Sequence, residues 1–500
     1  MSALTLGLAL LSSACNSDET WETAPINYSG TKITAFSLKK NNKILNNLDS
    51  IYFSIDLLEG RIYNANPLPC DTRIDSLGVT VSADACSELK LIMKVGEKTD
   101  STIDYIANTD KAVVNFSEGP VRLHIVSADG QSERDYMITL NVAPAVADSL
   151  YWDELNRGAL SGVDGMTRSK TVKVGDKALM LSASATGAAA ISTFIPATKS
   201  GGGNWTANPV TPEFYTSSPD VNDVAGLVSP TLNVESFTAS DQGFLYVLDT
   251  DGRLFISTDE GRTFKLLDNG WVSISAPYPV VNSVLGVKES DGKKVWAIGS
   301  PHSGTREFGE ISADFPLSGV SAAVSLSTIW SPKPMIVMTG GRPASGTPSG
   351  ATWAYDGSRW AKISDDLPAG EGYAMTQYTI CETDTMTWRA SQKNVLIAFG
   401  GYDGEAISRE VWISRDMGVN WQKGSQLLQL PEYMPAPIGA SLMTFDKTLS
   451  VNNASTMAIK PITTWDCPYL YMFGGYDARG AIIDEYWSGV INHLTWKPLQ

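Results

Sequence analysis

Paired carboxylates are the side chains in this sequence that could break a chemical bond. Two acidic groups about 5–10 Å apart can hydrolyse a glycosidic linkage, one as the acid and the other as base or nucleophile. Four acidic residues lie at or near strand-like runs: Glu235, Glu371, Glu382 and Asp384. Exposed loop charge is the alternative interpretation of each, so a glycoside hydrolase or lyase is one hypothesis among several.

Metal and cofactor chemistry has little support in the sequence. Its three histidines are His124, His302 and His493, and no CxxC pair, HExxH helix, Walker loop or GxSxG elbow occurs. Zinc, nucleotide and activated-serine sites are usually recognised by those spacings. We therefore expect neither a metal nor a cofactor.

A cysteine follows a short apolar run at the start of the chain. Residues 1–14 are too few to cross a bilayer, which needs about 20 residues, and they fit the apolar part of a signal peptide. The run ends in Leu11-Ser-Ser-Ala-Cys15, which resembles a bacterial lipobox, although the branched residue stands four positions before the cysteine rather than three. No Lys or Arg precedes the run, so the true start lies upstream or the charged region is incomplete.

The residues after this cysteine indicate where the protein is held. Asp18 and Glu19 resemble the surface-export signal of Bacteroidetes lipoproteins. We expect residues 1–14 to be a lipoprotein signal peptide, Cys15 to be acylated, and residues 15–30 to be a tether. The protein would then be lipid-anchored in the outer membrane and face the cell surface; an ordinary cleaved signal is the alternative.

The other cysteines would lie in an oxidising compartment, where disulfides form. Cys70 and Cys86 flank a predicted strand, Leu77 to Ser82, and could form a local disulfide, although a free buried cysteine is a common alternative. Cys381 and Cys467 lie in different repeats, and we predict no bond between them.

Composition narrows the classes of partner. The 500 residues are 43% hydrophobic and 18% charged, which fits a folded globular protein. Lys and Arg number 38 against 54 Asp and Glu, giving a formal net charge of −16. Such an excess of acid argues against binding to the phosphates of nucleic acid or to anionic lipid headgroups.

The segment from 31 to 143 alternates apolar and polar residues in short runs bounded by turn formers, which favours antiparallel strands with one wet face. Its predicted strands are 33–38, 51–55, 77–81, 112–116, 121–126 and 136–142. The last two are joined through Asp129-Gly130. This ending resembles that of cadherin-like β-sandwich modules of bacterial surface proteins, so we predict a cadherin- or Ig-like sandwich.

The segment from 150 to 500 repeats a unit of an apolar strand, a second strand and an aromatic-bearing third. Each unit is preceded by a further β-like run, such as 171–174, 281–287 or 321–327. The apolar strands begin at Ala178, Phe244, Val295, Met335, Val395 and Tyr469. Six units of four strands predict an all-β fold with a six-bladed β-propeller after the sandwich.

Two motifs support this architecture. Apolar strands ending in Gly-Gly at 340–341, 400–401 and 474–475 resemble kelch repeats, where the glycines allow a bend and close packing. Ser257 to Phe264 and Ser414 to Trp421 resemble the Asp-box of sialidase-like propellers. That resemblance implies that Asp259 and Asp416 brace turns, and that the aromatic residue packs between blades.

The enzymes known on such propellers are not supported. The Phe/Tyr-Arg-Ile-Pro motif of sialidases is absent, and the arginines lie mostly in predicted outer strands and turns. Galactose oxidase, a kelch-type propeller, requires two His, two Tyr and a Cys around copper, and the three histidines are too few and too scattered.

Taken whole, the chain resembles an uncharacterised family of Bacteroidetes surface lipoproteins with a sandwich and a kelch/Asp-box propeller. The resemblance implies a non-catalytic binding module, most readily for glycans. Four tryptophans outside the repeated strand positions could stack on sugar rings, with packing between blades as the alternative: Trp152, Trp271, Trp330 and Trp388. A protein-interaction or adhesion scaffold is the second hypothesis, and the hydrolase or lyase is the third.

Overall fold

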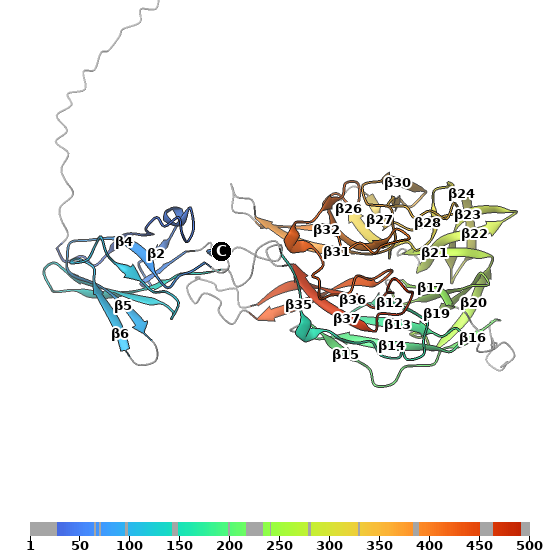
Figure 1. Ribbon diagram of the computed structural model, residues 1–500, viewed down its shortest axis with the longest axis horizontal. Helices are drawn as coiled ribbons and strands as arrows, with labels where there is room; N and C mark the ends of the chain where they lie inside the picture. Colours follow the sequence, from blue (N-terminus) through green and yellow to red (C-terminus); the bar gives the residue numbers. More distant parts are fainter. Residues whose placement is uncertain are drawn as a thin grey trace, which may run out of the picture. The chain divides into compact units, whose positions relative to one another are not determined.

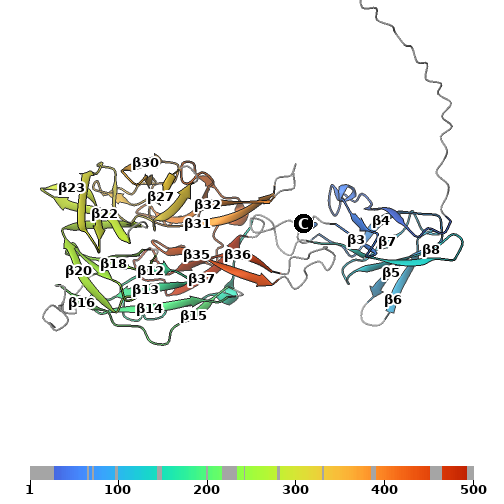
Figure 2. The same cartoon turned by 180° about the vertical axis from the view of Figure 1, so that it is seen from behind.

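The computed structural model describes residues 28–491 except 65–66, 70–71, 96–98, 143–148, 199–200, 217–233, 241, 279–281, 329–330, 384–389 and 451–463. Every regular element in these residues is a β-strand or a short 3₁₀ helix, so the all-β prediction is confirmed. The chain divides into two compact units after Val142, and each is described by itself (Figures 1 and 2).

The first unit contains two sheets and the 3₁₀ helix η1 (Leu48–Ser50). The smaller sheet has the order β1 (Ile33–Leu38), β4 (Leu77–Ala83), β7 (Val113–Val114). The larger has the order β2 (Ser54–Asp56), β3 (Arg61–Tyr63), β9 (Glu133–Thr139), β8 (Val121–Ser127), β5 (Cys86–Val95), β6 (Thr99–Asp104). One apolar core takes Val79 from the smaller sheet together with Leu91 and Leu123 from the larger.

Strand β5 pairs with both β6 and β8 and was not predicted from the sequence. It alternates buried Leu89, Leu91 and Met93 with Lys90, Ile92 and Lys94, which are half-buried or exposed. Glu and Lys are poor strand formers by propensity, and their frequency here masks the period of two. Burial of the alternate face against the core outweighs that preference.

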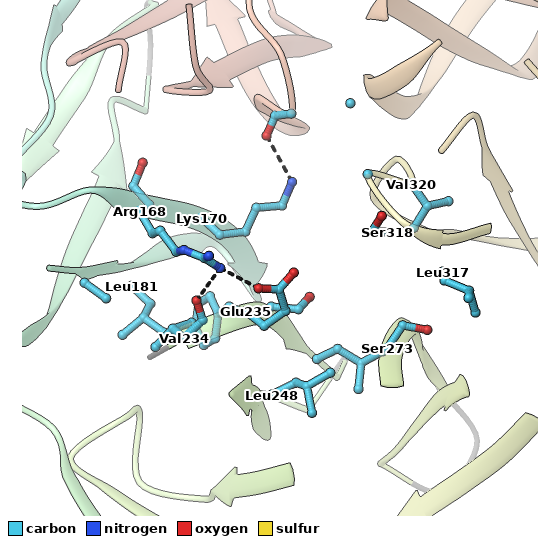
Figure 3. Close-up of a pocket in the computed structure, with 18 of the residues that line it drawn as sticks. Arg168, Lys170, Leu181, Val234, Glu235, Leu248, Ser273, Leu317, Ser318 and Val320 are labelled. Carbon is cyan, nitrogen blue, oxygen red and sulfur yellow. Dashed lines mark hydrogen bonds and ion pairs between the residues drawn. The ribbon is translucent and has the colours of Figure 1, made fainter. Parts of the chain in front are cut away.

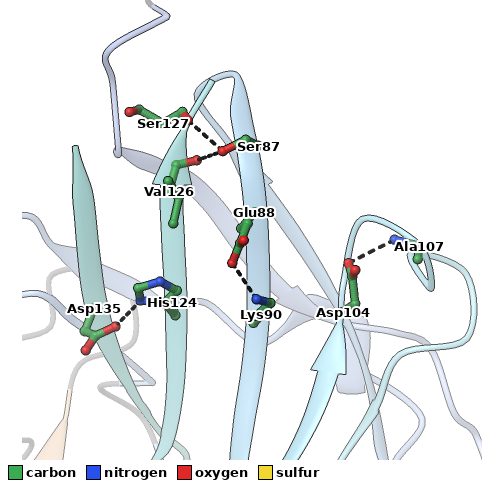
Figure 4. Close-up of polar contacts among 9 residues, drawn as sticks. All are labelled: Ser87, Glu88, Lys90, Asp104, Ala107, His124, Val126, Ser127 and Asp135. Atoms are coloured by element: carbon green, nitrogen blue, oxygen red, sulfur yellow. Dashed lines mark hydrogen bonds and ion pairs between the residues drawn. The ribbon is translucent and has the colours of Figure 1, made fainter. Parts of the chain in front are cut away.

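Charged and polar side chains occupy the other face of this sheet. Lys90 Nζ lies 2.5 Å from Glu88 Oε2, and His124 Nδ1 lies 2.7 Å from Asp135 Oδ1 on the neighbouring strand (Figure 4). These pairs are largely solvated, so they contribute little to stability. The face is therefore a solvated sheet surface, as the alternation predicted.

The second unit contains six sheets of four or five strands among its described residues. The first sheet has the order β12 (Arg168–Val174), β13 (Lys177–Ala183), β14 (Ala189–Pro196), β15 (Gly203–Trp205). The second has the order β17 (Val234–Ala239), β18 (Leu245–Asp249), β19 (Arg253–Ser257), β20 (Thr263–Asn269), β16 (Glu213–Tyr215). The third has the order β21 (Trp271–Tyr278), β22 (Ser283–Ser290), β23 (Lys293–Ser300), β24 (Gly304–Glu310).

The remaining sheets follow the same pattern. The fourth has the order β26 (Val324–Thr328), β27 (Ser331–Thr339), β29 (Thr352–Tyr355), β30 (Trp360–Ser364). The fifth has the order β31 (Glu371–Thr383), β32 (Ala390–Tyr402), β33 (Val411–Ser414), β34 (Gln422–Lys423). The sixth combines β35 (Ser441–Ser450), β36 (Thr464–Phe473) and β37 (Glu485–Ile491) with β10 (Leu150–Trp152) and β11 (Gly158–Ala159). A two-stranded ribbon, β25 (Pro316–Ser318) with β28 (Arg342–Pro343), and the 3₁₀ helices η2 (Glu154–Asn156) and η3 (Gln426–Leu428) complete the unit.

The first strands of successive sheets lie against one another. Strand β12 contacts β17 and β35, β17 contacts β21, and β31 contacts β26 and β35. Strand β21 contacts the ribbon strand β25, which precedes the fourth sheet in the chain. The six sheets therefore meet along the strands that begin each of them.

The sixth sheet takes strands from both ends of the unit. Leu150 pairs with Ile491 and Trp152 with Gly489 in antiparallel register. Trp152 is only 1% exposed and packs edge-on to Phe399 of the fifth sheet, with ring centroids 6.1 Å apart. The proposal that Trp152 is a loop residue free to stack on sugar is therefore wrong, because the strand that holds it closes the sixth sheet.

The third sheet begins one strand earlier than the repeat predicted. The sequence frame took 281–287 as its first strand and Val295 to Gly299 as its apolar second strand. Strand β21 in fact precedes these, and it starts at Trp271. Trp271 is 3% exposed in the core shared with the second sheet, and its indole Nε1 donates to Asp268 at 3.1 Å. It too is a core residue and not a ligand-stacking one.

We predict that Trp152→Ala lowers the free energy of unfolding of the second unit by about 3–5 kcal/mol. The substitution would leave a cavity between the fifth and sixth sheets and weaken the closing strand. Chemical denaturation followed by circular dichroism measures this. The matched control is Tyr151→Ala on the opposite face of the same strand, where the side chain is 54% exposed and we expect a change within about 0.5 kcal/mol. Equal effects of the two substitutions would contradict the assignment.

Candidate functional site

A cavity of about 370 Å³ opens where the first strands of the sheets begin, and we call it the strand-end pocket. Its walls come from the starts of β12, β17 and β21, from β25 and the two residues after it, from Gly372 of β31, and from Gly439 and Tyr476 beside β35 and β36. The ends of β13 and β18 add Leu181 and Leu248. The volume is within the range of small-molecule sites.

Arg168 and Glu235 form an ion pair across one wall (Figure 3). The guanidinium Nη1 lies 2.6 Å from Glu235 Oε2 and donates to the Val234 carbonyl at 2.8 Å. Both side chains are nearly half exposed, so water still reaches them. The pair presents both donors and acceptors to the pocket while its own charges cancel.

Lys170 stands beside this pair and has no such neutralising partner. Its ammonium donates to the carbonyl of Gly439 at 3.2 Å, and among the residues described no carboxylate forms an ion pair with it. The side chain is half-buried, and loss of hydration lowers the pKa of Lys170 to about 8. Burial penalises a charged amine because the ammonium loses bound water. The single carbonyl contact replaces only part of that hydration.

The carbonyl that binds Lys170 is one end of a chain of peptide groups. The Gly439 N–H donates to Gly372 O at 2.7 Å, and the Gly372 N–H donates to Gly319 O at 2.6 Å. All three glycines line the pocket, and a Cβ at Gly372 would lie 2.6 Å from Ile438. This glycine chain ties the segment after β25 to the fifth sheet and to the start of the sixth without any side chain.

Hydroxyl groups and small apolar side chains supply the rest of the lining. The Tyr476 hydroxyl accepts a hydrogen bond from Ser169 N at 3.1 Å, and burial raises the pKa of this phenol. Ser273 Oγ is buried and has no hydrogen-bond partner in the described structure. Leu181, Leu248 and Leu317 form apolar wall between these groups. The surface can therefore make both hydrogen bonds and apolar contacts with a ligand.

The two motif turns are built identically. Asp259 Oδ1 accepts from Thr263 N at 2.9 Å and Asp416 Oδ1 accepts from Asn420 N at 2.9 Å. In each turn a serine hydroxyl donates to the same carboxylate. Although burial opposes ionisation, hydrogen bonds win and hold the pKa of both carboxyls below the ordinary value. The prediction that these aspartates brace turns is confirmed.

The aromatic residues after these turns pack between sheets, as predicted. Phe264 stacks on Phe214 with ring centroids 4.9 Å apart in the core of the first and second sheets. Trp421 follows the fifth sheet's turn, and its indole Nε1 donates to Thr352 Oγ1 of the fourth sheet at 2.9 Å. Neither turn approaches the strand-end pocket.

The double glycines also behave as predicted. Gly400 and Gly401 have φ of 82° and 89°, which side chains disfavour. A Cβ on Gly401 would lie 2.5 Å from the Tyr373 ring of the neighbouring strand. The bend and the close packing therefore occur at the same place.

Models of two known protein-family domains match this chain. Residues 31–140 match the model of the DUF6242 N-terminal domain, a domain of unknown function, and residues 146–499 match the DUF6242 β-propeller domain. The chain belongs to the DUF6242 family. Its second unit is therefore a β-propeller domain, which is the architecture that the repeats predicted. No curated protein matches the chain.

Solved structures resemble the DUF6242 chain only distantly. A triple mutant of AofleA from Arthrobotrys oligospora aligns with a TM-score of 0.34 and 11% identity, over 65% of this chain and 83% of the other. The SapL1 lectin in complex with alpha methyl fucoside aligns with a TM-score of 0.33 and 14% identity, over 62% and 90%. Likeness at this level does not extend to a binding site.

Of the four acidic residues predicted for the DUF6242 chain, the structure describes the side chains of two. Glu235 lines the strand-end pocket, whereas Glu371 lies behind its wall and accepts hydrogen bonds from Arg342 at 2.5 and 2.9 Å. Glu382 lies in the last part of β31, residues 380–383, whose side chains are not described, and Asp384 lies outside the described residues. Both described carboxylates are engaged by arginines.

Other predicted residues lie beyond the pocket or beyond the described structure. Trp330, Trp388, Cys15 and Cys70 are outside the described residues. Cys86 is a free, half-buried cysteine, and burial raises the pKa of its thiol. Because Cys70 lies outside the described residues, the disulfide between Cys70 and Cys86 stays a prediction.

No motif in the sequence marked Arg168 and Lys170 as pocket residues. The predicted first strand began at Thr171, so its two basic neighbours were left outside the inner strand.

Within the described residues no helix is long and apolar enough to cross a membrane. Nor do those residues contain a group of three or more His, Cys, Asp or Glu side chains placed to hold a metal.

We predict that Glu235→Gln changes the free energy of unfolding by less than about 1 kcal/mol, because its ion pair with Arg168 is solvated. Glu371→Gln, which breaks a more buried two-bond pair with Arg342, should cost about 1.5–3 kcal/mol. Denaturant unfolding of the two variants distinguishes them. A large loss for Glu235→Gln would show that this pair maintains the fold and is not available to a ligand.

Proposed function

We propose that this DUF6242 protein is a non-catalytic binding module whose strand-end pocket holds a glycan. The observation that carries the proposal is the pocket itself, a cavity lined by the first, second, third and fifth sheets, by the ribbon strand β25 and the two residues after it, and by residues beside the sixth sheet. Its lining alternates hydroxyl and charged groups with leucine side chains, and a sugar ring likewise carries hydroxyls around an apolar face. The proposal rests on this chemistry and not on the distant structural likenesses.

We propose further that the propeller has six blades and that the first unit is a cadherin- or Ig-like β-sandwich. In support of six blades, there are six sheets among the described residues and their first strands contact one another in succession. Pairing of β10 with β37 joins the start of the domain to its end, as ring closure requires. In support of a sandwich, two sheets of the first unit share one apolar core.

A binding role fits the pocket better than hydrolysis. Among its lining residues, Glu235 alone carries a carboxylate, and Arg168 holds it in an ion pair. The two-carboxylate mechanism needs a second acidic group facing the first across the substrate. Glu371 does not supply that group because both of its oxygens accept hydrogen bonds from Arg342.

A protein-interaction scaffold is the second candidate, favoured by an exposed apolar patch. The patch consists of Tyr151, Leu155, Leu427 and Tyr433, which are 49–92% exposed. They lie around β10 and its neighbouring 3₁₀ helices, and Tyr433 donates from its hydroxyl to the Trp152 carbonyl at 3.2 Å. Tyrosine-rich exposed patches are typical of protein contacts.

We also propose that the protein is a Bacteroidetes-type surface lipoprotein, held by acylated Cys15 in the outer membrane. The lipobox-like sequence and the acidic residues after it support this placement. A pocket carried on a tethered domain at the surface would meet extracellular polysaccharides directly.

Glycan binding is tested with the chain from residue 20 onward, which retains every described residue. On an array of polysaccharides and host glycans we expect binding without release of product. Ser318→Trp should abolish binding, because Ser318 is exposed in the pocket wall and an indole there would fill the cavity. Ser303→Trp, in an exposed turn between outer strands β23 and β24, is the control and should bind normally. Product release would overturn the non-catalytic assignment, and equal binding by both variants would move the ligand away from this pocket.

The anchor is tested by Cys15→Ala in the full chain. We expect loss of fatty-acid labelling and a shift of the protein from the membrane fraction to the soluble fraction, because the acylated thiol is the proposed attachment. Metabolic labelling with an alkyne fatty acid and fractionation measure both. Unchanged partitioning would rule out the lipoprotein assignment.

A further inference from the structure

The strand-end pocket holds one more positive charge than negative charge. Its charged lining residues are Arg168, Lys170 and Glu235. Arg168 and Glu235 neutralise each other at 2.6 Å, which leaves the Lys170 ammonium as the unbalanced group. The protein as a whole carries a formal net charge of −16, so the sign of the charge in the pocket is opposite to that of the whole chain.

The surroundings of Lys170 hold the ammonium in place without balancing its charge. Of its three N–H donors, one is directed to the Gly439 carbonyl at 3.2 Å. That carbonyl belongs to the glycine chain through Gly372 and Gly319, so the backbone fixes the acceptor. A carbonyl dipole orients a cation but leaves its net charge, and a half-buried charge without a counter-ion is costly.

A ligand with a single negative charge would remove this imbalance. Resting on the proposed glycan-binding role, we propose that the pocket selects acidic sugars and that Lys170 binds the carboxylate of a uronate residue. One carboxylate matches the single excess charge, and the Arg168–Glu235 pair is left to bind neighbouring sugar hydroxyls. A sulfate or phosphate group, which favours several cationic donors around it, fits less well.

The expected pH dependence follows from the same group. Lys170 is charged below its pKa of about 8 and neutral above it, so affinity for an acidic glycan should fall as the pH rises from 7 to 9, approaching tenfold per unit above the pKa. The other titratable or charged groups facing the pocket are Arg168 and Glu235, which are paired, and Tyr476, whose phenol pKa is raised by burial. A neutral glycan should show no such fall.

The test uses an oligogalacturonate and its carboxyl-reduced neutral counterpart, titrated calorimetrically into the chain from residue 20 onward. We expect the acidic oligosaccharide to bind at least tenfold more tightly, and Lys170→Gln to remove that preference while Lys170→Arg keeps part of it. Lys173→Gln is the matched control: it removes the same charge from the same strand, but Lys173 is bonded to the Thr444 carbonyl and lies outside the pocket lining. Circular dichroism confirms that each variant is folded.

The outcomes separate the two proposals. Equal affinity for both oligosaccharides in the unmodified protein would overturn the acidic-sugar inference and leave the glycan-binding role intact. A preference for acid that survives Lys170→Gln would overturn the assignment to Lys170. Failure of the protein to bind either compound or any neutral glycan of the array would overturn the proposed function and this inference with it.

Discussion

Antiparallel pairing of Leu150–Trp152 with the end of the sixth sheet is the constraint on which the propeller domain depends. It joins residues more than three hundred positions apart and buries Trp152 between the fifth and sixth sheets. Without it β37 would lack a partner over Gly489 to Ile491, and the sixth sheet would lose Trp152, one of the residues that pack it against the fifth. Closing so long a loop is entropically costly and slow, which indicates that the domain completes its fold late, when both ends are available.

The strand-end pocket inherits this dependence. No single segment contains it: β12 supplies Lys170, β17 supplies Glu235, and Gly439 comes from the other end of the domain. Contact between the first and second sheets brings Lys170 near Glu235, and Gly439 joins them because the sixth sheet packs against the first. Binding chemistry and domain closure are therefore linked.

Local features of the fold could be predicted from the sequence, and long-range ones could not. The bend at the double glycine 400–401 and the turns at Asp259 and Asp416 depend on residues that are close in the sequence. A short motif is therefore enough to predict them. Strand β10 has no such motif, because only its distant partner makes it a strand. The same limitation explains why Trp152 and Trp271 were assigned to loops, and why β5, with its charged alternate face, was missed. Lys170 became recognisable only from its place in the pocket, where no carboxylate of the described residues forms an ion pair with it.

The glycine chain has a consequence for how this pocket can change over evolutionary time. Because Gly319, Gly372 and Gly439 connect three separate segments of the pocket wall through backbone groups alone, the frame of the pocket does not depend on the side chains that face it. Residues such as Ser318, Leu317 or Arg168 can therefore be exchanged without disturbing that frame. Relatives could keep the same rim and yet recognise chemically different molecules, so that the domain works as an adaptable receptor whose specificity diverges faster than its architecture.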